Sequence, residues 1–271
     1  MKNLSVCVPV DDGRTLAATL RSILVQDTDV EVIVLDNSPG RNGPADAADD
    51  TVVAVARSFE DTRLRVHRNA EALPLGENWN KAVSLSSGRF VKLVRPGDTL
   101  LPDALDKQLA VMGDNGIALC ASRFQLIDEH GTVVATDLGL PGLLGRRDAR
   151  ALMRTLVHRG PEQFGPITTA VFRRQDFDRV GGFRGGQPGF PMDADLFARV
   201  TAFGDFHGLP EILVARSDST ADPAASTVTA LTEMLRFHHR LGSEYPQYVG
   251  RAAVLGGDWR LARAAAARVR R

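Results

Sequence analysis

Short apolar segments alternate with helix-like segments in the first part of the chain, and this alternation restricts the possible folds more than any other feature. Four apolar runs are typical of buried strands, at Leu4–Val10, Val30–Leu35, Leu64–His67 and Phe90–Val94. Between them, Thr15–Gln26 repeats Leu and Ile at helical spacing, and Asn78–Ser86 is a second predicted helix. Strands that alternate with helices pair in parallel. We therefore expect an α/β fold with a Rossmann-like, doubly wound, mostly parallel sheet that has helices on both faces.

The second part of the chain has a different pattern. Ile117–Ile127 and Thr132–Thr136 flank the turn sequence "DEHG" and predict a hairpin. Further helices are predicted over Asp148–His158 and Asp193–Phe203. From Thr227 onward the chain is rich in Ala, Leu and Arg, which predicts a C-terminal helical extension.

Three polar loops each follow a predicted strand. They contain Val10–Asp12, Asp36–Ser38 and Arg95–Asp98, the last within the string "VRPGDTL". The carboxyl ends of parallel strands meet at one edge of a sheet, and ligands of such sheets bind beyond that edge. The three loops are therefore expected to gather into one binding site.

Charge and composition exclude several classes of protein. The chain has 33 Lys and Arg against 33 Asp and Glu, so its net charge does not favour a nucleic-acid surface. No apolar run is long enough to span a bilayer, and "MKNLSVCVPV" reads as a strand and not as a signal peptide. Cys7 and Cys120 lie in separate apolar runs, which is typical of buried, reduced thiols and of a cytoplasmic protein.

An ordered series of segments resembles the family 2 inverting glycosyltransferases of the GT-A fold. The series contains "SVCVPV", "VEVIVLDNS", "LGENWNKAVSLSSGRFVKLV" and "GDTLLPDAL", and "GPITTAVFRRQDFDRVGGF" and "MDADLFARVTAFGDFHGLPEILVARSDS" continue it. The resemblance covers roughly residues 4–220. It implies a GT-A domain with a nucleotide-sugar-binding half at residues 1–115 and an acceptor-binding, catalytic half at residues 116–221. Residues 222–271 form the helical extension.

The resemblance also implies how the first strands bind the donor. The turn at Pro9, Val10 and Asp11 matches the family segment that packs on the nucleotide base. Asp36 matches the aspartate that bonds the edge of the base. An aspartate at such a turn can instead serve only to form the turn, so that alternative stays open.

A segment before the fourth strand matches the one that borders the diphosphate in this family. The matching positions are Gly76, Trp79, Asn80 and Lys81 in "LGENWNK". Trp79 is equally suited to the hydrophobic core.

The turn that normally holds a divalent metal is altered in this chain. Only Asp98 remains where the family has two or three acids, and Arg95 stands beside it. Asp218 matches the later metal ligand of the family. Two alternatives follow: Asp98 and Asp218 bind Mg²⁺ or Mn²⁺ with help from the diphosphate and water, or Arg95, Lys92 or Lys81 neutralises the diphosphate directly.

Asp193 in "PMDADLFARV" matches the catalytic base of the family, with Met192 in place of the usual glutamate. An inverting transfer needs one carboxylate to remove the proton of the acceptor hydroxyl. An aspartate here can also cap the helix that follows. Asp195 lies two positions further on and is expected to face elsewhere.

The sequence thus predicts a nucleotide-sugar-dependent, inverting glycosyltransferase that acts on a hydroxyl or amine of a small-molecule or glycan acceptor. Residues 137–192 and the C-terminal helices are the predicted acceptor region, and a homodimer is left open. Two alternatives remain: a catalytically degenerate nucleotide-sugar-binding or scaffold protein of the same fold, and a nucleotidyltransferase. The second usually has a Gly-rich, basic loop after the first strand, whereas "VPVDDGRTL" has one glycine.

Overall fold

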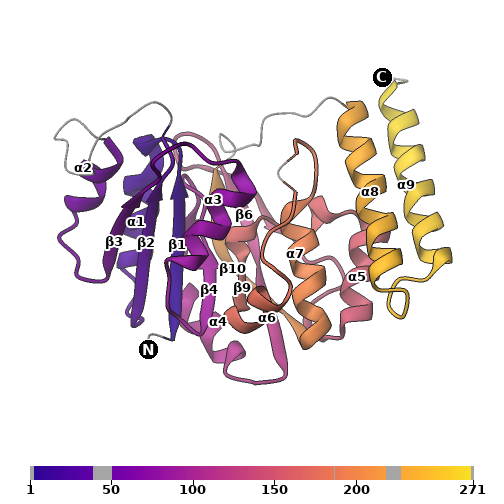
Figure 1. Ribbon diagram of the computed structural model, residues 1–271, viewed down its shortest axis with the longest axis horizontal. Coiled ribbons are helices and arrows are strands. Elements are labelled where there is room, and N and C mark those ends of the chain that lie inside the picture. The colour runs from indigo at the N-terminus through magenta and orange to yellow at the C-terminus, as the bar shows by residue number, and fades with distance from the viewer. Residues whose placement is uncertain (1–2, 39–50, 186, 218–226, 270–271) are drawn as a thin grey trace.

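A computed structural model describes residues 3–38, 51–185, 187–217 and 227–269 of the chain (Figure 1). Its strands form one sheet in the order β3-β2-β1-β4-β9-β6-β10-β5, with β7 beside β6 and β8 beside β10. The strands are β1 Leu4–Val10, β2 Val30–Asp36, β3 Leu64–Arg68, β4 Phe90–Leu93, β5 Thr99–Leu100, β6 Ile117–Ile127, β7 Val133–Leu138, β8 Gly145–Arg147, β9 Ala170–Arg173 and β10 Asp205–Ser217.

Helices cover both faces of this sheet, as the alternating pattern predicts. The α-helices are α1 Leu16–Leu24, α2 Thr51–Arg57, α3 Leu75–Ser84, α4 Ala104–Met112, α5 Ala149–Arg159, α6 Arg174–Arg179, α7 Met192–Val200, α8 Thr227–Glu244 and α9 Arg251–Val269. Short 3-10 turns occur at Gly13–Thr15, Pro161–Gln163, Ile167–Thr169 and Thr201–Phe203. Side chains of α1, α2 and α4 share one hydrophobic core, and those of α3, α5, α6 and α7 share another on the opposite face.

The period of two in strand β1 explains how one strand serves both cores. Leu4, Val6 and Val8 pack on the α1 side, whereas Cys7 points to the α3 side. Cys7 and Cys120 are both buried and free, and burial raises the pKa of each thiol to about 12. The predicted burial of both cysteines is confirmed.

The predicted parallel pairing holds for the first part of the chain and changes in the second. Strand β1 pairs in parallel with β2 and β4, and β2 pairs in parallel with β3. Strand β9 then runs antiparallel to both β4 and β6. The sheet is therefore mixed, and β9 joins the two parts through hydrogen bonds to each.

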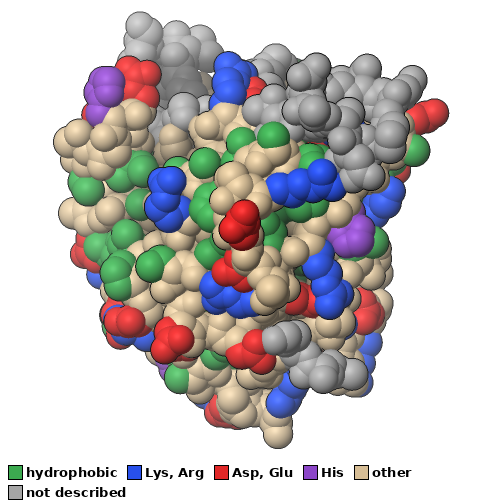
Figure 2. All heavy atoms as spheres, turned by 90° about the vertical axis from the view of Figure 1, so that its left-hand side faces the viewer, with side chains coloured by type: hydrophobic (Ala, Val, Ile, Leu, Met, Phe, Trp, Pro, Cys, Tyr) green, Lys and Arg blue, Asp and Glu red, His purple; other side chains and the backbone are tan. Residues whose placement is uncertain are grey.

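The predicted helical extension consists of α8 and α9, which lie side by side at the end of the molecule opposite β3 (Figure 1). Helix α9 also packs against α5. At the other end, Figure 2 shows basic and acidic side chains interspersed with small hydrophobic areas on the face that carries β3. This mixed face agrees with the net charge of zero.

Candidate functional site

The carboxyl ends of β1 and β2 lie together at one edge of the sheet, as predicted. Val10 pairs with Asp36 in the strand register, and the Asn37 N–H donates to the Val10 carbonyl at 2.7 Å. The Asn37 side-chain amide also donates to the Asp11 carboxylate at 2.8 Å. Pro9 and Val10 are buried at this edge, while Asp11 is exposed. The residues expected to receive the base are thus adjacent, although their role in binding stays a prediction.

Asp36 is fully buried, and both of its carboxylate oxygens have partners. Arg68 donates two hydrogen bonds to one oxygen, at 2.9 and 2.8 Å. The other oxygen accepts from the Ser38 N–H at 2.9 Å and from its hydroxyl at 2.6 Å. Burial alone would raise the pKa of Asp36, but these hydrogen bonds hold it below the ordinary value. The turn-forming role is therefore real, and a contact with a base would have to share or exchange one of these partners.

Helix α3 is tied to the loop that precedes α7. The Phe183 N–H donates to the Asn80 side chain at 2.8 Å, and the Asn80 amide donates back to the Phe183 carbonyl at 3.0 Å. Trp79 is 5% exposed and packs edge-on against Phe183, with ring centroids 5.1 Å apart. Trp79 is thus a core residue. Asn80 holds the loop in place, and Lys81 lies half-buried beside it; the diphosphate contacts of both stay predictions.

The altered metal turn folds its remaining carboxylate inward. Asp98 is fully buried, and the Thr168 hydroxyl donates to it at 2.5 Å. Gly97 has a φ of 95°, a conformation that favours glycine, and its N–H donates to the Thr19 hydroxyl at 2.9 Å. Burial raises the pKa of Asp98, against the influence of Arg95 and Arg216 nearby. Arg216, at the end of β10, is a cation near this turn that sequence reasoning missed.

Lys92 is not available to a diphosphate at the surface. Its side chain is fully buried, and its ammonium donates to the Gln108 side chain at 2.8 Å and to the Thr168 carbonyl at 2.6 Å. Burial lowers its pKa to about 7. The prediction that Lys92 could neutralise the diphosphate is therefore wrong, because the strand points this side chain into the interior. Lys81 and Arg95 are only partly buried.

Asp193 is held by the backbone of a segment far away in sequence. The Ile167 N–H donates to its carboxylate at 2.9 Å. The N-cap of α7 is Pro191, and Asp193 lies within the first turn, so the helix-cap alternative does not describe its position. Thr168 follows Ile167 and bonds Asp98. One 3-10 turn therefore joins the predicted base to the altered metal turn.

Asp195 faces away from Asp193, as predicted, but it is a structural residue. It is fully buried and forms ion pairs with Arg199 at 2.7 Å and with Arg184 at 3.1 Å. Removing one partner of a buried ion pair destabilises a protein strongly, by about 3–5 kcal/mol. Asp195 is therefore unsuitable as a neutral control for Asp193.

The described residues do not fit a divalent metal. Across residues 3–38, 51–185, 187–217 and 227–269, no group of three or more His, Cys, Asp and Glu side chains is arranged to hold an ion. Asp98 alone, buried and bonded to Thr168, does not provide the several oxygens that Mg²⁺ or Mn²⁺ requires. Asp218, the other predicted ligand, lies outside the described residues.

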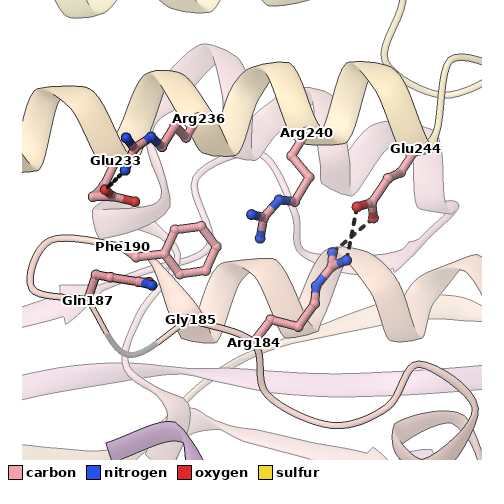
Figure 3. Close-up of a pocket in the computed structure, with 8 residues that line it drawn as sticks. All are labelled: Arg184, Gly185, Gln187, Phe190, Glu233, Arg236, Arg240 and Glu244. Atoms are coloured by element: carbon pink, nitrogen blue, oxygen red, sulfur yellow. Dashed lines mark hydrogen bonds and ion pairs between the residues drawn. The ribbon is translucent and has the colours of Figure 1, made fainter.

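A pocket of about 570 Å³ lies between α8 and the loop before α7 (Figure 3). The loop and the helix each supply half of its lining, which consists of Arg184, Gly185, Gln187, Phe190, Glu233, Arg236, Arg240 and Glu244. Sequence reasoning placed the acceptor region here only as ranges and named none of these residues. The signal was present in α8, where four charged residues recur three or four positions apart on one face.

Comparison with known proteins assigns the chain to a family. The sequence profile of glycosyl transferase family 2 matches residues 5–181, more than half of the chain. The chain therefore belongs to glycosyl transferase family 2. Within the part of the chain that the structure describes, no helix has both the length and the apolar character needed to cross a membrane.

Curated relatives match only parts of longer proteins. The uncharacterised protein y4gI of Sinorhizobium fredii is 29% identical over an alignment of 219 residues that covers 74% of this chain and 23% of that protein. The Escherichia coli protein named UDP-Glc:alpha-D-GlcNAc-diphosphoundecaprenol beta-1,3-glucosyltransferase WfgD is 26% identical over 120 residues, 44% of each chain. The matches thus span less than half the length of these relatives.

Solved structures with the same fold include TarS and a mannosyltransferase. S. aureus TarS 1–349 in complex with UDP-GlcNAc has a TM-score of 0.66 at 14% identity, over 89% of this chain and 66% of that chain. The mannosyltransferase PcManGT of Pyrobaculum calidifontis, in complex with GDP-Man and Mn²⁺, has a TM-score of 0.58 at 14% identity, over 98% and 75%. The expected GT-A fold is confirmed.

Proposed function

We propose that this chain transfers a sugar from a nucleotide-diphosphate sugar to a hydroxyl or amine of an acceptor, with inversion at the anomeric carbon. The observation that carries the proposal is the position of Asp193. Its carboxylate is half-buried and oriented by the Ile167 N–H, one residue from the contact between Thr168 and Asp98. A carboxylate fixed in this way close to the altered metal turn is suited to act as a general base.

The proposed reaction is a single displacement. The acceptor oxygen or nitrogen attacks the anomeric carbon from the face opposite the diphosphate, and Asp193 takes the proton that the acceptor loses. The bond from the anomeric carbon to the diphosphate breaks, and the nucleoside diphosphate leaves with the bonding electrons. Arg95, with Arg216 near it, is proposed to stabilise the negative charge that develops on the leaving group.

Three observations on related proteins support a nucleotide-sugar donor. TarS is solved with UDP-GlcNAc, PcManGT with GDP-Man and Mn²⁺, and WfgD is named for a UDP-Glc donor. We propose a donor of this class, without assigning its base or its sugar. No step of the proposed reaction is assigned to a divalent metal, because Asp98 is the sole predicted ligand among the described residues.

A thermal-shift screen against UDP-, TDP- and GDP-sugars, with and without Mn²⁺, tests donor binding. A ligand that binds only the folded chain, present at 100 times its Kd, should stabilise it by about 2.7 kcal/mol.

Asp36→Asn keeps the size of the side chain but weakens its bonds to Arg68 and, as proposed, to the base. We expect nucleoside diphosphate binding to weaken by about 1–3 kcal/mol.

Asp61 provides a matched control at the amino-terminal ends of the strands, away from the proposed base site. Asp61 also pairs with an arginine, Arg63, at 2.8 Å, but it lies before the start of β3. Asp61→Asn should leave calorimetric affinity for the nucleoside diphosphate unchanged. Equal affinity in Asp36→Asn and wild type would place the base elsewhere.

The degenerate, non-catalytic alternative is favoured by one observation, the inward burial of Asp98 at the altered metal turn. It predicts nucleotide-sugar binding without transfer or hydrolysis of the donor. Release of nucleoside diphosphate by the wild-type chain, in an amount well above that from an Asp193→Asn variant, would exclude this alternative.

A further inference from the structure

The pocket in Figure 3 contains five charged side chains, and four of them neutralise one another. Arg184 pairs with Glu244 at 2.9 Å and also with the buried Asp195. Arg236 forms an ion pair with Glu233. Both acidic residues of the lining are therefore already committed to arginines.

Arg240 is the remaining charge, and it lies between these two pairs on α8, where it points into the pocket (Figure 3). Its guanidinium carbon is 5.4 Å from the centre of the Phe190 ring. Among the described residues it forms an ion pair with none. Phe190 is itself fixed by an edge-on contact with Phe237, at 6.5 Å between centroids. The pocket thus carries one uncompensated, oriented positive charge.

The same loop connects this pocket to the proposed reaction site. Phe190 lies three residues before Asp193 in the chain. Gly185, on the other side of the loop, packs closely against Gly76 in the first turn of α3. The contact is so close that a Cβ added to Gly76 would lie 3.3 Å from the Gly185 carbonyl oxygen. The loop therefore lies between the helix of the proposed donor site and α8. A group bound in the pocket would be held beside the helix that carries Asp193.

We propose that this pocket binds a phosphate-type anionic group of the acceptor and that Arg240 is its anchoring cation. The inference rests on the proposed transferase function and narrows the acceptor to a phosphorylated compound. A volume of about 570 Å³ is in the range of small-molecule sites, roughly 300–1,000 Å³. Arginine binds phosphate oxygens through paired N–H groups, and the ring of Phe190 keeps the guanidinium plane in place.

The test uses inorganic pyrophosphate, titrated into the full-length chain and followed by NMR through the Nε–Hε signals of the arginines. The Arg240 signal is identified by its loss in Arg240→Gln. In the wild type this signal should shift and saturate. In Arg240→Gln the Arg236 signal should need at least about tenfold more pyrophosphate for the same response, as expected for a lost charged hydrogen bond.

The matched control is Arg251→Gln, which removes an exposed arginine from the start of α9. It should leave the pyrophosphate response of Arg240 unchanged. A static Arg240 signal in the wild type, or an unchanged response of Arg236 in Arg240→Gln, would overturn the proposal. An equal loss in Arg251→Gln would also overturn it, since the attraction would then be common to the arginines of α8 and α9.

Failure of this inference can be separated from failure of the proposed function. Thermal shifts by nucleoside diphosphates should be the same in Arg240→Gln and wild type, because Arg240 lies outside the proposed donor site. Nucleotide shifts with a static Arg240 signal would reject the anion pocket alone. A saturating Arg240 signal with no response to any nucleotide would support the pocket and reject the proposed donor chemistry.

Discussion

Asp193 lies in the first turn of α7, where it accepts a hydrogen bond from the Ile167 N–H. Asn has nearly the same size and can still accept that bond, but it cannot take a proton at neutral pH. We therefore expect Asp193→Asn to fold normally and to bind the donor as the wild type does. Sugar transfer should fall by about 10²–10⁴-fold, the usual contribution of a general base. Single-turnover rates with saturating donor provide the measurement.

The control for Asp193→Asn has to be an acid that supports no buried network. Asp178 is exposed on the neighbouring helix α6, and Asp178→Asn should leave the rate nearly unchanged. Asp195→Asn is different, because it weakens the buried pairs with Arg199 and Arg184 and should lower stability. Wild-type turnover by Asp193→Asn would show that this aspartate is not the base.

At the scale of elements, β4, α4 and the turn at Ile167–Thr169 meet around one buried ammonium. Lys92 extends from β4 to Gln108 of α4 and to the Thr168 carbonyl. Its pKa is lowered from 10.5 to about 7 by burial. Between these two pH values the unfolded chain holds more protons on this lysine than the folded chain does. The free energy of unfolding should therefore rise with pH across this window.

We predict that urea unfolding at pH 7, 8 and 9 will show this rise, with a contribution from Lys92 of at most about 1.4 kcal/mol per pH unit. Lys92→Met should flatten the slope, whatever it does to absolute stability, because it removes the titrating group. Lys107→Met, a half-buried lysine on α4, should keep the slope. An equal slope in the Lys92 variant would mean that other groups cause it.

At the scale of the whole molecule, the altered metal turn is completed by distant segments. Asp98 lies within the influence of Arg95, in the same turn, and of Arg216, at the end of β10. The Arg216 Nε is buried and has no hydrogen-bond partner among the described residues. Two arginines from different parts of the chain thus approach this turn.

We predict that metal dependence is weak or partial. EDTA should reduce transfer less than Arg95→Ala does, because a cation of the protein takes over the neutralisation of the diphosphate. Rates with EDTA, with added Mn²⁺ and in the variant give the comparison. Complete loss in EDTA that Mn²⁺ restores, together with an active Arg95→Ala variant, would show that a metal and not Arg95 serves the diphosphate.

Local patterns in the sequence were sufficient for most of the first half of the fold. Strand β1 has the predicted limits, and β2, β3 and α1 differ from prediction by at most a few residues. These elements are regular, and the spacing of their apolar residues indicates whether one face or both faces are buried. Strand β10 was not predicted at its full length, because its pairing with β6 contains register shifts that interrupt the alternation.

The sequence by itself determined the alternating architecture, the family and the residues that end the first strands, since these depend on short-range periodicity and on motifs in order. Only the tertiary structure decided what those residues contact. It turned Lys92 and Asp98 into the interior, bonded Asp193 to Ile167, and set Arg240 opposite Phe190. The physical reason is that burial and partners are properties of segments brought together from far along the chain, which no local pattern records.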